Sequence, residues 1–458
     1  MLKLTIGEIG EALDYPVFGC RDTRITGVAT DSRQVQSGDL FVAIVGEKVD
    51  GHHYIAQALA NGATAVVISD VSVKETLTDM TCLLAEDGVT FIQKLGRLVR
   101  QRAQVPVVAV TGSSGKTTTK DLLRAMLAGL GPVVATRGNN NNELGLPLTL
   151  CQIDESTRAV VVEMGMRGLG QIDFLCQLAQ PDYGLITNIG TVHSELLGSQ
   201  ENIAKAKAEL LAHLGPLGTA VLNEKDRAFL TDYADDCAGR VVWCSVQNGQ
   251  GDVWAEDILE EAESTVFTIK GAVGEHTLTS ALPGLHNVEN ALEAIVIART
   301  LGVSWETIEQ ALMALELTAM RMEKLLSPQG AVIYNDAYNA NPDSMRAALS
   351  VLAAKKGRRA AVLGDMYELG QYEAESHRQI GQAAMALGLD LLIAVGQLGR
   401  LIGQGAEMAA QAGQTVYYAE DNNQAALYLQ DWLRAGDQVL IKGSRGMQME
   451  EIVEIIMR

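Results

Sequence analysis

Cysteine is scarce in this chain, and its six copies are scattered. No two of them form a C-x-x-C pair among the 458 residues. Such a pattern argues against a disulfide framework or a zinc site and fits reduced thiols in the cytosol. The seven histidines form no ligand cluster in the sequence either. The sequence therefore predicts a cytoplasmic protein without structural disulfides.

Long apolar runs and an excess of positive charge are also missing. No run of 18 apolar residues occurs, and Glu8, Glu11 and Asp14 interrupt the N-terminal segment. We therefore expect neither membrane insertion nor a signal peptide. The formal net charge is −20, which argues against a nucleic-acid partner because a phosphate backbone would be repelled. Any anionic ligand must be held by a local group of cations.

Length and composition favour several α/β domains. A chain of 458 residues exceeds what one hydrophobic core usually serves, and 47% hydrophobic residues with 45 glycines suit α/β architecture. We expect domains at residues 1–102, 103–317 and 318–458, the last two built on parallel sheets. Apolar runs predict strands at 40–45, 65–68, 159–163, 183–188, 331–334, 359–363, 391–395 and 439–442, and helices at 91–102 and 305–317.

The segment VPVVAVTGSSGKTTTK at residues 105–120 is the most informative one in the chain. A β-branched run breaks into a glycine-rich turn, and apolar residues at helical spacing follow. The N–H groups of such a turn bind phosphate, Lys116 can reach the β- and γ-phosphates, and the Thr117 hydroxyl can ligate Mg²⁺. Val110 stands where the general pattern has glycine, so the loop is a shortened form. The alternative is a glycine turn with an incidental lysine. The predicted nucleotide loop comprises Gly112, Ser113, Ser114, Gly115, Lys116, Thr117 and Thr118.

Polar residues also end two later strands. Glu163 closes the run 159–163 and offers the oxygen ligand that a divalent ion bridging phosphates needs. The loop after 183–188 carries His193, a candidate metal ligand or phosphate contact. The alternatives are a solvated glutamate and a solvated histidine.

Several strings resemble the Mur ligases, the amide-forming enzymes of peptidoglycan precursor synthesis. TGSSGKTT, VEMGMRG, TNIGTVH and AKAKAELL follow one another as in the ATP-binding domain of that family. NDAYNANPDSM, LGDM and KGSR in the third block are similar to the branch that adds D-alanyl-D-alanine, and DSR, GDLF and DGH near the N-terminus resemble its uridine-nucleotide domain. The resemblance implies a small α/β uridine-nucleotide domain, a central P-loop-type parallel-sheet ATPase domain and a C-terminal Rossmann-like α/β domain.

The resemblance also implies an activity. ATP would phosphorylate the terminal carboxylate of a UDP-N-acetylmuramoyl tripeptide, and the amine of D-alanyl-D-alanine would attack the acyl phosphate. The protein would act as a monomer in the cytoplasm, and the third residue of the tripeptide, diaminopimelate or lysine, stays open. The alternatives are the ligase that adds that third residue, whose Asp-Asn-Pro-Arg motif is absent, a folate polyglutamate ligase, and a P-loop kinase or switch-type NTPase.

Two Mg²⁺ sites follow from the resemblance. Thr117 and Glu163 would hold one ion, and His193 the second, which a carbamylated Lys207 would bridge. Lys116, His193 and Lys207 would be the catalytic residues. Lys205 is the competitor of Lys207 and lies about 200° away around a helix.

The resemblance assigns further residues to ligands. Asn287 would contact adenine, although it also suits a helix N-cap. Arg321 would reach the nucleotide from a hinge in which Ala319 stands where glycine is common. The ATP would be covered from the third domain by Asp336, Tyr338 and Asn339. Substrate contacts would come from Ser32, Arg33, Asn139, Asn141, Asn142, Lys442, Ser444 and Arg445. The alternatives are a polar turn for the asparagines and a generic basic loop for the last three.

Overall fold

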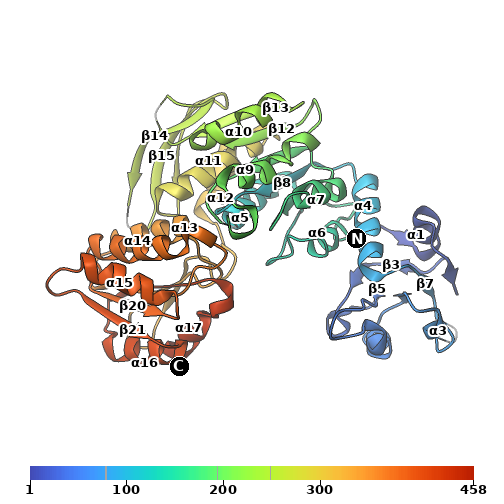
Figure 1. Cartoon of the computed structure of the whole chain (residues 1–458). Coiled ribbons are helices and arrows are strands. Elements are labelled where there is room, and N and C mark those ends of the chain that lie inside the picture. Colours follow the sequence, from blue (N-terminus) through green and yellow to red (C-terminus); the bar gives the residue numbers. More distant parts are fainter. Residues whose placement is uncertain (78–79, 193, 248, 262) are drawn as a thin grey trace.

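The computed structural model describes residues 1–77, 80–192, 194–247, 249–261 and 263–458. Three α/β parts follow one another along the chain, each with its own main sheet. The N-terminal and C-terminal parts lie at opposite ends of the molecule, with the central part between them (Figure 1). The expected α/β chain of three domains is confirmed.

The N-terminal part is a small, mostly parallel sheet with helices around it. Its elements are β1 (Leu4–Thr5), α1 (Ile6–Leu13), β2 (Val17–Phe18), β3 (Arg24–Ile25), β4 (Gly27–Ala29), β5 (Asp39–Val42), α2 (Ile55–Ala60), β6 (Ala65–Ile68), α3 (Val71–Lys74), β7 (Cys82–Leu84) and α4 (Gly88–Arg102). The strand order is β2-β7-β6-β5-β4, and only β2 is antiparallel. The carboxyl ends of β4 to β7 therefore share one edge.

The central part is a large twisted sheet. Its elements are β8 (Val107–Thr111), α5 (Lys116–Leu127), β9 (Val133–Ala135), α6 (Gly145–Leu150), β10 (Ala159–Glu163), α7 (Gln171–Ala179), β11 (Tyr183–Ile186), α8 (Ser194–Leu197), α9 (Gln200–Ala208), β12 (Thr219–Asn223), α10 (Arg227–Asp235), β13 (Arg240–Ser245), β14 (Val253–Glu260), β15 (Thr265–Gly271), β16 (His276–Ser280), α11 (Leu285–Thr300) and α12 (Trp305–Met313). Within the described ranges the strand order is β16-β15-β14-β13-β12-β11-β8-β10-β9.

The central strands are parallel from β9 to β14, as expected, but β14, β15 and β16 add an antiparallel extension that the sequence did not predict. The sequence gives little sign of this extension because β14 is only partly buried and carries acidic residues between its apolar ones. Helices α5, α11 and α12 bury one face of the sheet, and α4, α6, α7 and α9 cover the other. Helix α12 ends at Met313, earlier than expected.

The C-terminal part is a Rossmann-like sheet between two helix layers. Its elements are β17 (Glu323–Leu326), β18 (Val332–Asn335), α13 (Pro342–Ala353), β19 (Arg359–Leu363), α14 (Glu373–Ala386), β20 (Leu391–Val395), α15 (Gly399–Ala409), β21 (Thr415–Ala419), α16 (Asn422–Trp432), β22 (Gln438–Lys442) and α17 (Glu450–Ile456). The order is β17-β18-β22-β19-β20-β21. All strands are parallel except β17, which follows the segment 314–322, called the hinge below, and pairs with β18 as a hairpin.

Helix α4 joins the N-terminal part to the centre by packing against α6 and α7 as well as α1. Its apolar stripe belongs to a core that continues into the central part. A short segment between α12 and β17 joins the centre to the C-terminal part. In the described part of the chain, no helix is long and apolar enough to cross a membrane.

Candidate active site

The predicted nucleotide loop joins β8, a buried inner strand of the central sheet, to the start of α5. Two glycines are required by its backbone. Gly112 and Gly115 have φ of 148° and 79°, and an added Cβ would overlap the Thr187 hydroxyl at Gly112 and the Asn290 amide at Gly115. The Lys116 ammonium folds back over the loop and donates to the Gly112 carbonyl at 2.7 Å.

Asn188, at the end of the neighbouring strand β11, holds the loop in shape. Its Oδ1 accepts from the Ser114 N–H at 3.0 Å, and its Nδ2 donates to the Ser114 hydroxyl at 2.9 Å. The Ser113 hydroxyl accepts from the Gly190 N–H at 2.8 Å. These contacts pre-organise a turn whose N–H groups can bind phosphate. The sequence did not assign this role, although Asn188 lies at a strand end, where such residues gather.

Thr117 and Glu163 meet at the start of α5. The Thr117 hydroxyl donates to Glu163 Oε2 at 2.8 Å, and both residues are buried. Asn141 Nδ2 donates to the other carboxylate oxygen at 2.8 Å. Arg321 reaches the same point from the hinge, donating to Thr117 Oγ1 at 2.9 Å, and its guanidinium stacks on the Tyr338 ring at 4.1 Å.

Lys207 lies in α9 and is only 1% exposed, whereas Lys205 is exposed. Burial, with the nearby Lys116 charge, lowers the pKa of Lys207 well below its usual value. Burial and the charge of Arg321 also lower the pKa of Lys116, against the opposing effect of Glu163. His193 lies outside the described residues.

The nucleotide loop lines one cavity of about 990 Å³ between the central and C-terminal parts, together with Asn141, Glu163, Lys207, Arg321 and Tyr338. Its walls come from the ends of β8, β10, β18, β19 and β22 and from α5, α7 and α9. The residues singled out from the sequence that line it are Gly112, Ser113, Ser114, Gly115, Lys116, Thr117, Asn139, Asn141, Asn142, Glu163, Lys207, Arg321, Tyr338, Asn339, Lys442, Ser444 and Arg445. Several cations thus converge in a chain of strongly negative net charge.

Three of the residues predicted to bind the nucleotide do not line this cavity. Thr118 is half-buried in the first turn of α5. Asn287 lies in the first turn of α11, and its amide donates to the Pro283 carbonyl at 2.8 Å. The capping alternative for Asn287 is wrong because the helix begins at Leu285, with Gly284 at the N-cap.

Asp336, the third of these residues, is engaged beside the cavity. Its Oδ2 accepts from the Lys442 ammonium at 2.6 Å, and its Oδ1 accepts from the Met322 N–H at 3.2 Å. Lys442 donates also to the Asn339 carbonyl at 2.8 Å, and its burial lowers its pKa while Asp336 opposes that shift. The ion pair therefore ties the β18 loop to the β22 loop.

Some residues that line the cavity were not predicted as site residues from the sequence. Arg167 and Phe174 come from the segment after β10, and Tyr367 and Glu368 from the segment after β19. Arg167 approaches Glu368 to 3.7 Å across the two parts. The signal that could have found them is their position after the ends of parallel strands.

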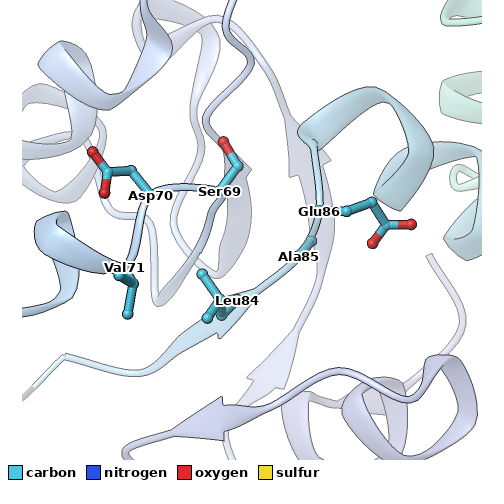
Figure 2. A pocket seen from close by; sticks show the side chains of 6 residues that line it. All are labelled: Ser69, Asp70, Val71, Leu84, Ala85 and Glu86. Atoms are coloured by element: carbon cyan, nitrogen blue, oxygen red, sulfur yellow. The ribbon is translucent and has the colours of Figure 1, made fainter.

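A second cavity, of about 520 Å³, lies in the N-terminal part. Figure 2 shows Ser69, Asp70 and Val71 after β6, and Leu84, Ala85 and Glu86 at the end of β7. Its carboxylates are engaged, because Asp70 accepts from the Ser72 hydroxyl and Glu86 pairs with Lys94. Its lining contains no cation.

Ser32 and Arg33 follow β4 at the same edge of the N-terminal sheet, away from the large cavity. The Ser32 hydroxyl donates to Gln57 Oε1 at 2.7 Å. The Arg33 guanidinium pairs with Asp31 at 2.8 Å and is largely exposed. The candidate substrate residues are thus spread over all three parts of the molecule.

Comparison with known proteins matches all three parts. The family model of the Mur ligase middle domain matches residues 110–298, that of the Mur ligase, glutamate ligase domain residues 320–445, and that of the Mur ligase family, catalytic domain residues 24–97.

Individual relatives agree over nearly the whole length. The UDP-N-acetylmuramoyl-tripeptide--D-alanyl-D-alanine ligase of Bacillus subtilis (strain 168) is 37% identical, covering 99% of this chain and 98% of its own. The crystal structure of MurF from Acinetobacter baumannii is 32% identical with a TM-score of 0.86 and covers 99% of both chains. MurF ligase from Thermotoga maritima in complex with ADP is 29% identical with a TM-score of 0.80, covering 94% of this chain and 96% of its own. The chain therefore belongs to the Mur ligase family and, within it, to the UDP-N-acetylmuramoyl-tripeptide--D-alanyl-D-alanine ligases.

Proposed function

We propose that this chain joins D-alanyl-D-alanine to a UDP-N-acetylmuramoyl tripeptide, using ATP and forming ADP and phosphate through an acyl phosphate. The observation that carries the proposal is one cavity lined both by the glycine loop and Lys116 of the central part and by Arg321, Lys442 and Arg445 of the C-terminal part. An acyl-phosphate route brings several anions together, and this convergence of cations offsets their repulsion.

ATP binds along the glycine loop in this proposal. The loop N–H groups and Lys116 hold the phosphates, with Ser113, Ser114 and Thr118 shaping the turn. Arg321 adds positive charge from the hinge, and its Nε is buried without a partner in the described structure. Tyr338 and Asn339 cover the nucleotide from the C-terminal part. Asn287 contacts adenine, and Asp336 orients Lys442.

The oxygen donors at Thr117 and Glu163 fit a divalent ion such as Mg²⁺. Both are buried at the cavity, and Asn141 orients the carboxylate. Among the described residues no group of three His, Cys, Asp or Glu side chains is placed to hold a metal ion. That suits Mg²⁺, which takes one or two protein carboxylates and completes its shell with substrate phosphates and water. The ion would neutralise phosphate charge during transfer.

Lys207 is proposed to be carbamylated and, with His193, to hold a second Mg²⁺. A lysine ammonium has no acceptor, so the unmodified side chain cannot ligate a cation. Carbamylation needs the neutral amine, whose nitrogen bonds to the carbon of CO₂ and releases a proton. The lowered pKa of Lys207 favours that form.

The two other substrates meet the remaining residues. Lys442, Ser444 and Arg445 bind the carboxylate of D-alanyl-D-alanine, with arginine suited to a bidentate contact. The peptide of the nucleotide substrate lies along Asn139, Asn141 and Asn142, although Asn142 Oδ1 already accepts from the Gly145 N–H at 2.8 Å. The uridine end is bound near Ser32 and Arg33.

The proposed domain limits are residues 1–102, 103–317 and 318–458, and the protein is proposed to act as a cytoplasmic monomer. The limit at residue 102 falls at the end of α4, a helix that packs on α1 of the N-terminal part and on α6 and α7 of the central part.

The test is phosphate release by the purified protein with ATP, Mg²⁺, D-alanyl-D-alanine and, in turn, the diaminopimelate- and lysine-containing UDP-tripeptides. Release that requires both the dipeptide and one tripeptide supports the proposal. Release with ATP alone would identify an NTPase instead. Lys116→Ala is the inactive control, with kcat expected to fall about 10²-fold or more and the fold unchanged.

A further inference from the structure

The hinge between α12 and β17 is fastened to α5, the helix that starts at the nucleotide loop. The backbone N–H and the hydroxyl of Thr318 both donate to Asp121 Oδ2 at 2.9 Å. The other carboxylate oxygen of Asp121 pairs with the Lys120 ammonium at 2.7 Å. The side chains of this pair are only 3% and 4% exposed, so the anchor is shielded from water.

A second attachment point follows three residues later. Arg321 donates to the Thr117 hydroxyl, and Thr117 and Asp121 lie one turn apart on the same face of α5. Met320 and Met322, on either side of Arg321, have φ of 60° and 50°, a left-handed backbone that such side chains rarely adopt. Ala319, where the sequence raised the question of a missing glycine, is not left-handed. A strained segment persists only when its surroundings hold it in place.

The anchor also contacts the strand end that carries the candidate metal ligand. Lys120 Nζ donates to the Thr136 carbonyl at 3.2 Å, and the Thr136 hydroxyl accepts from the Glu163 N–H at 2.9 Å. Contacts therefore run from Glu163 through Thr136, Lys120 and Asp121 to the hinge, and return through Arg321 and Thr117 to Glu163.

We propose that Asp121 and Thr318 are positioning residues, which fix the hinge on α5 so that the strained turn delivers Arg321 to the nucleotide loop. The inference rests on the proposed contact of Arg321 with the nucleotide. The hydroxyl of Thr318, which also accepts from the Lys120 ammonium at 3.3 Å, can be removed while both charges of the buried Lys120–Asp121 ion pair are kept. Asp121 itself is a poorer first target, because its loss leaves a buried lysine unpaired.

The test compares Thr318→Val, Thr318→Ser and Arg321→Ala. Active sites are counted by ADP binding, kcat is expressed per ADP-binding site, and thermal unfolding is followed in parallel. Thr318→Val should lower kcat about tenfold or more, because a misplaced group near the reacting atoms is costly, while the number of ADP sites stays that of the wild type. Thr318→Ser, which keeps the hydroxyl, should restore kcat.

The matched control is Thr300→Val, since within the described residues the Thr300 hydroxyl bonds only to the Val296 carbonyl of its own helix. Its kcat should equal that of the wild type. Wild-type turnover in Thr318→Val, with Arg321→Ala slow, would overturn the inference and leave the proposed function standing. Wild-type turnover in Arg321→Ala would remove the role of Arg321 and the inference with it. A Thr318→Val defect that follows only the loss of ADP sites would show a purely structural residue and overturn the inference.

Discussion

At the scale of single residues, burial separates two lysines that lie two positions apart in α9. Lys207 lines the cavity and Lys205 is exposed. Lys207→Ala should reduce ligation by about 10²-fold or more, the cost of losing a group that stabilises charge at the reaction centre, and Lys205→Ala should be mild. Phosphate-release assays on both variants measure this. Depleting CO₂ and bicarbonate should slow the wild type reversibly.

An essential Lys205 would mean that the Ala-Lys-x-x-Leu register assigned to the carbamylated lysine is wrong by two residues. Activity that survives both substitutions would remove the carbamylated lysine from the proposal. If the activity of the wild type does not depend on CO₂, carbamylation is removed from the proposal, while the unmodified Lys207 amine keeps a role.

The buried carboxyl of Asp226 should make the stability of the fold depend on pH. Burial raises the pKa of its carboxyl to about 6, above the value of about 3.9 in an unfolded chain. Between these pH values the Asp226 carboxyl is protonated in the folded state but ionised in the unfolded state. The stability that this proton contributes is therefore fully present below about pH 4 and is lost as pH rises through 6. Asp226→Asn keeps an acceptor for the Ile189 N–H and removes the titration.

The asparagine variant should therefore be more stable than the wild type at pH 8, on the order of 1–3 kcal/mol, and nearly equal to it at pH 4. Thermal unfolding at both pH values measures the difference. Asp22→Asn, at an exposed position, should show no such difference. An equal offset between Asp226→Asn and wild type at both pH values would contradict the assignment.

At the scale of elements, the β8–α5 connection depends on the close approach of Gly112 to Thr187. An added methyl group would overlap the Thr187 hydroxyl in a backbone that also disfavours side chains. Gly112→Ala should weaken ADP binding at least tenfold and destabilise the fold by about 1–3 kcal/mol. Calorimetric titration and thermal unfolding measure these effects.

Gly215→Ala is the matched control for the loop, because a Cβ there meets nothing within 4 Å. It should bind ADP like the wild type. Wild-type affinity in Gly112→Ala would show that the loop tolerates a displaced backbone and that its shape is not set by Thr187.

At the scale of the whole molecule, the candidate substrate residues are divided between parts that the proposed reaction would have to bring together. Ser32 and Arg33 belong to the N-terminal part, and Lys442 and Arg445 to the C-terminal part, at the opposite end of the molecule (Figure 1). The hinge and α4 are the connections through which the parts can move. Adding an ATP analogue and UDP-tripeptide together should reduce the radius of gyration measured by small-angle X-ray scattering.

Lys116→Ala serves as the control for closure, because it should bind the nucleotide poorly and keep its dimensions under the same conditions. Identical scattering of the wild type with and without both ligands would count against ligand-dependent closure, unless the free enzyme were closed already.

The sequence by itself determined the features that local patterns record. The β-branched run and glycine turn at 105–120 predicted β8, the loop and α5, and the runs 159–163, 359–363 and 391–395 became strands with those limits. Such segments are readable because a buried parallel strand must be apolar throughout, and a turn that approaches phosphate must lack side chains. The strings shared with the Mur ligases supplied the family.

Only the tertiary structure decided which distant residues meet. The contact of Asp121 with Thr318 and that of Arg321 with Thr117 each join residues about 200 positions apart. The clamp of Asn188 on Ser114 and the antiparallel strands β15 and β16 are likewise products of packing. A residue pattern reports the preference of its own segment, whereas these contacts depend on how sheets and helices pack, so no local signal specifies them.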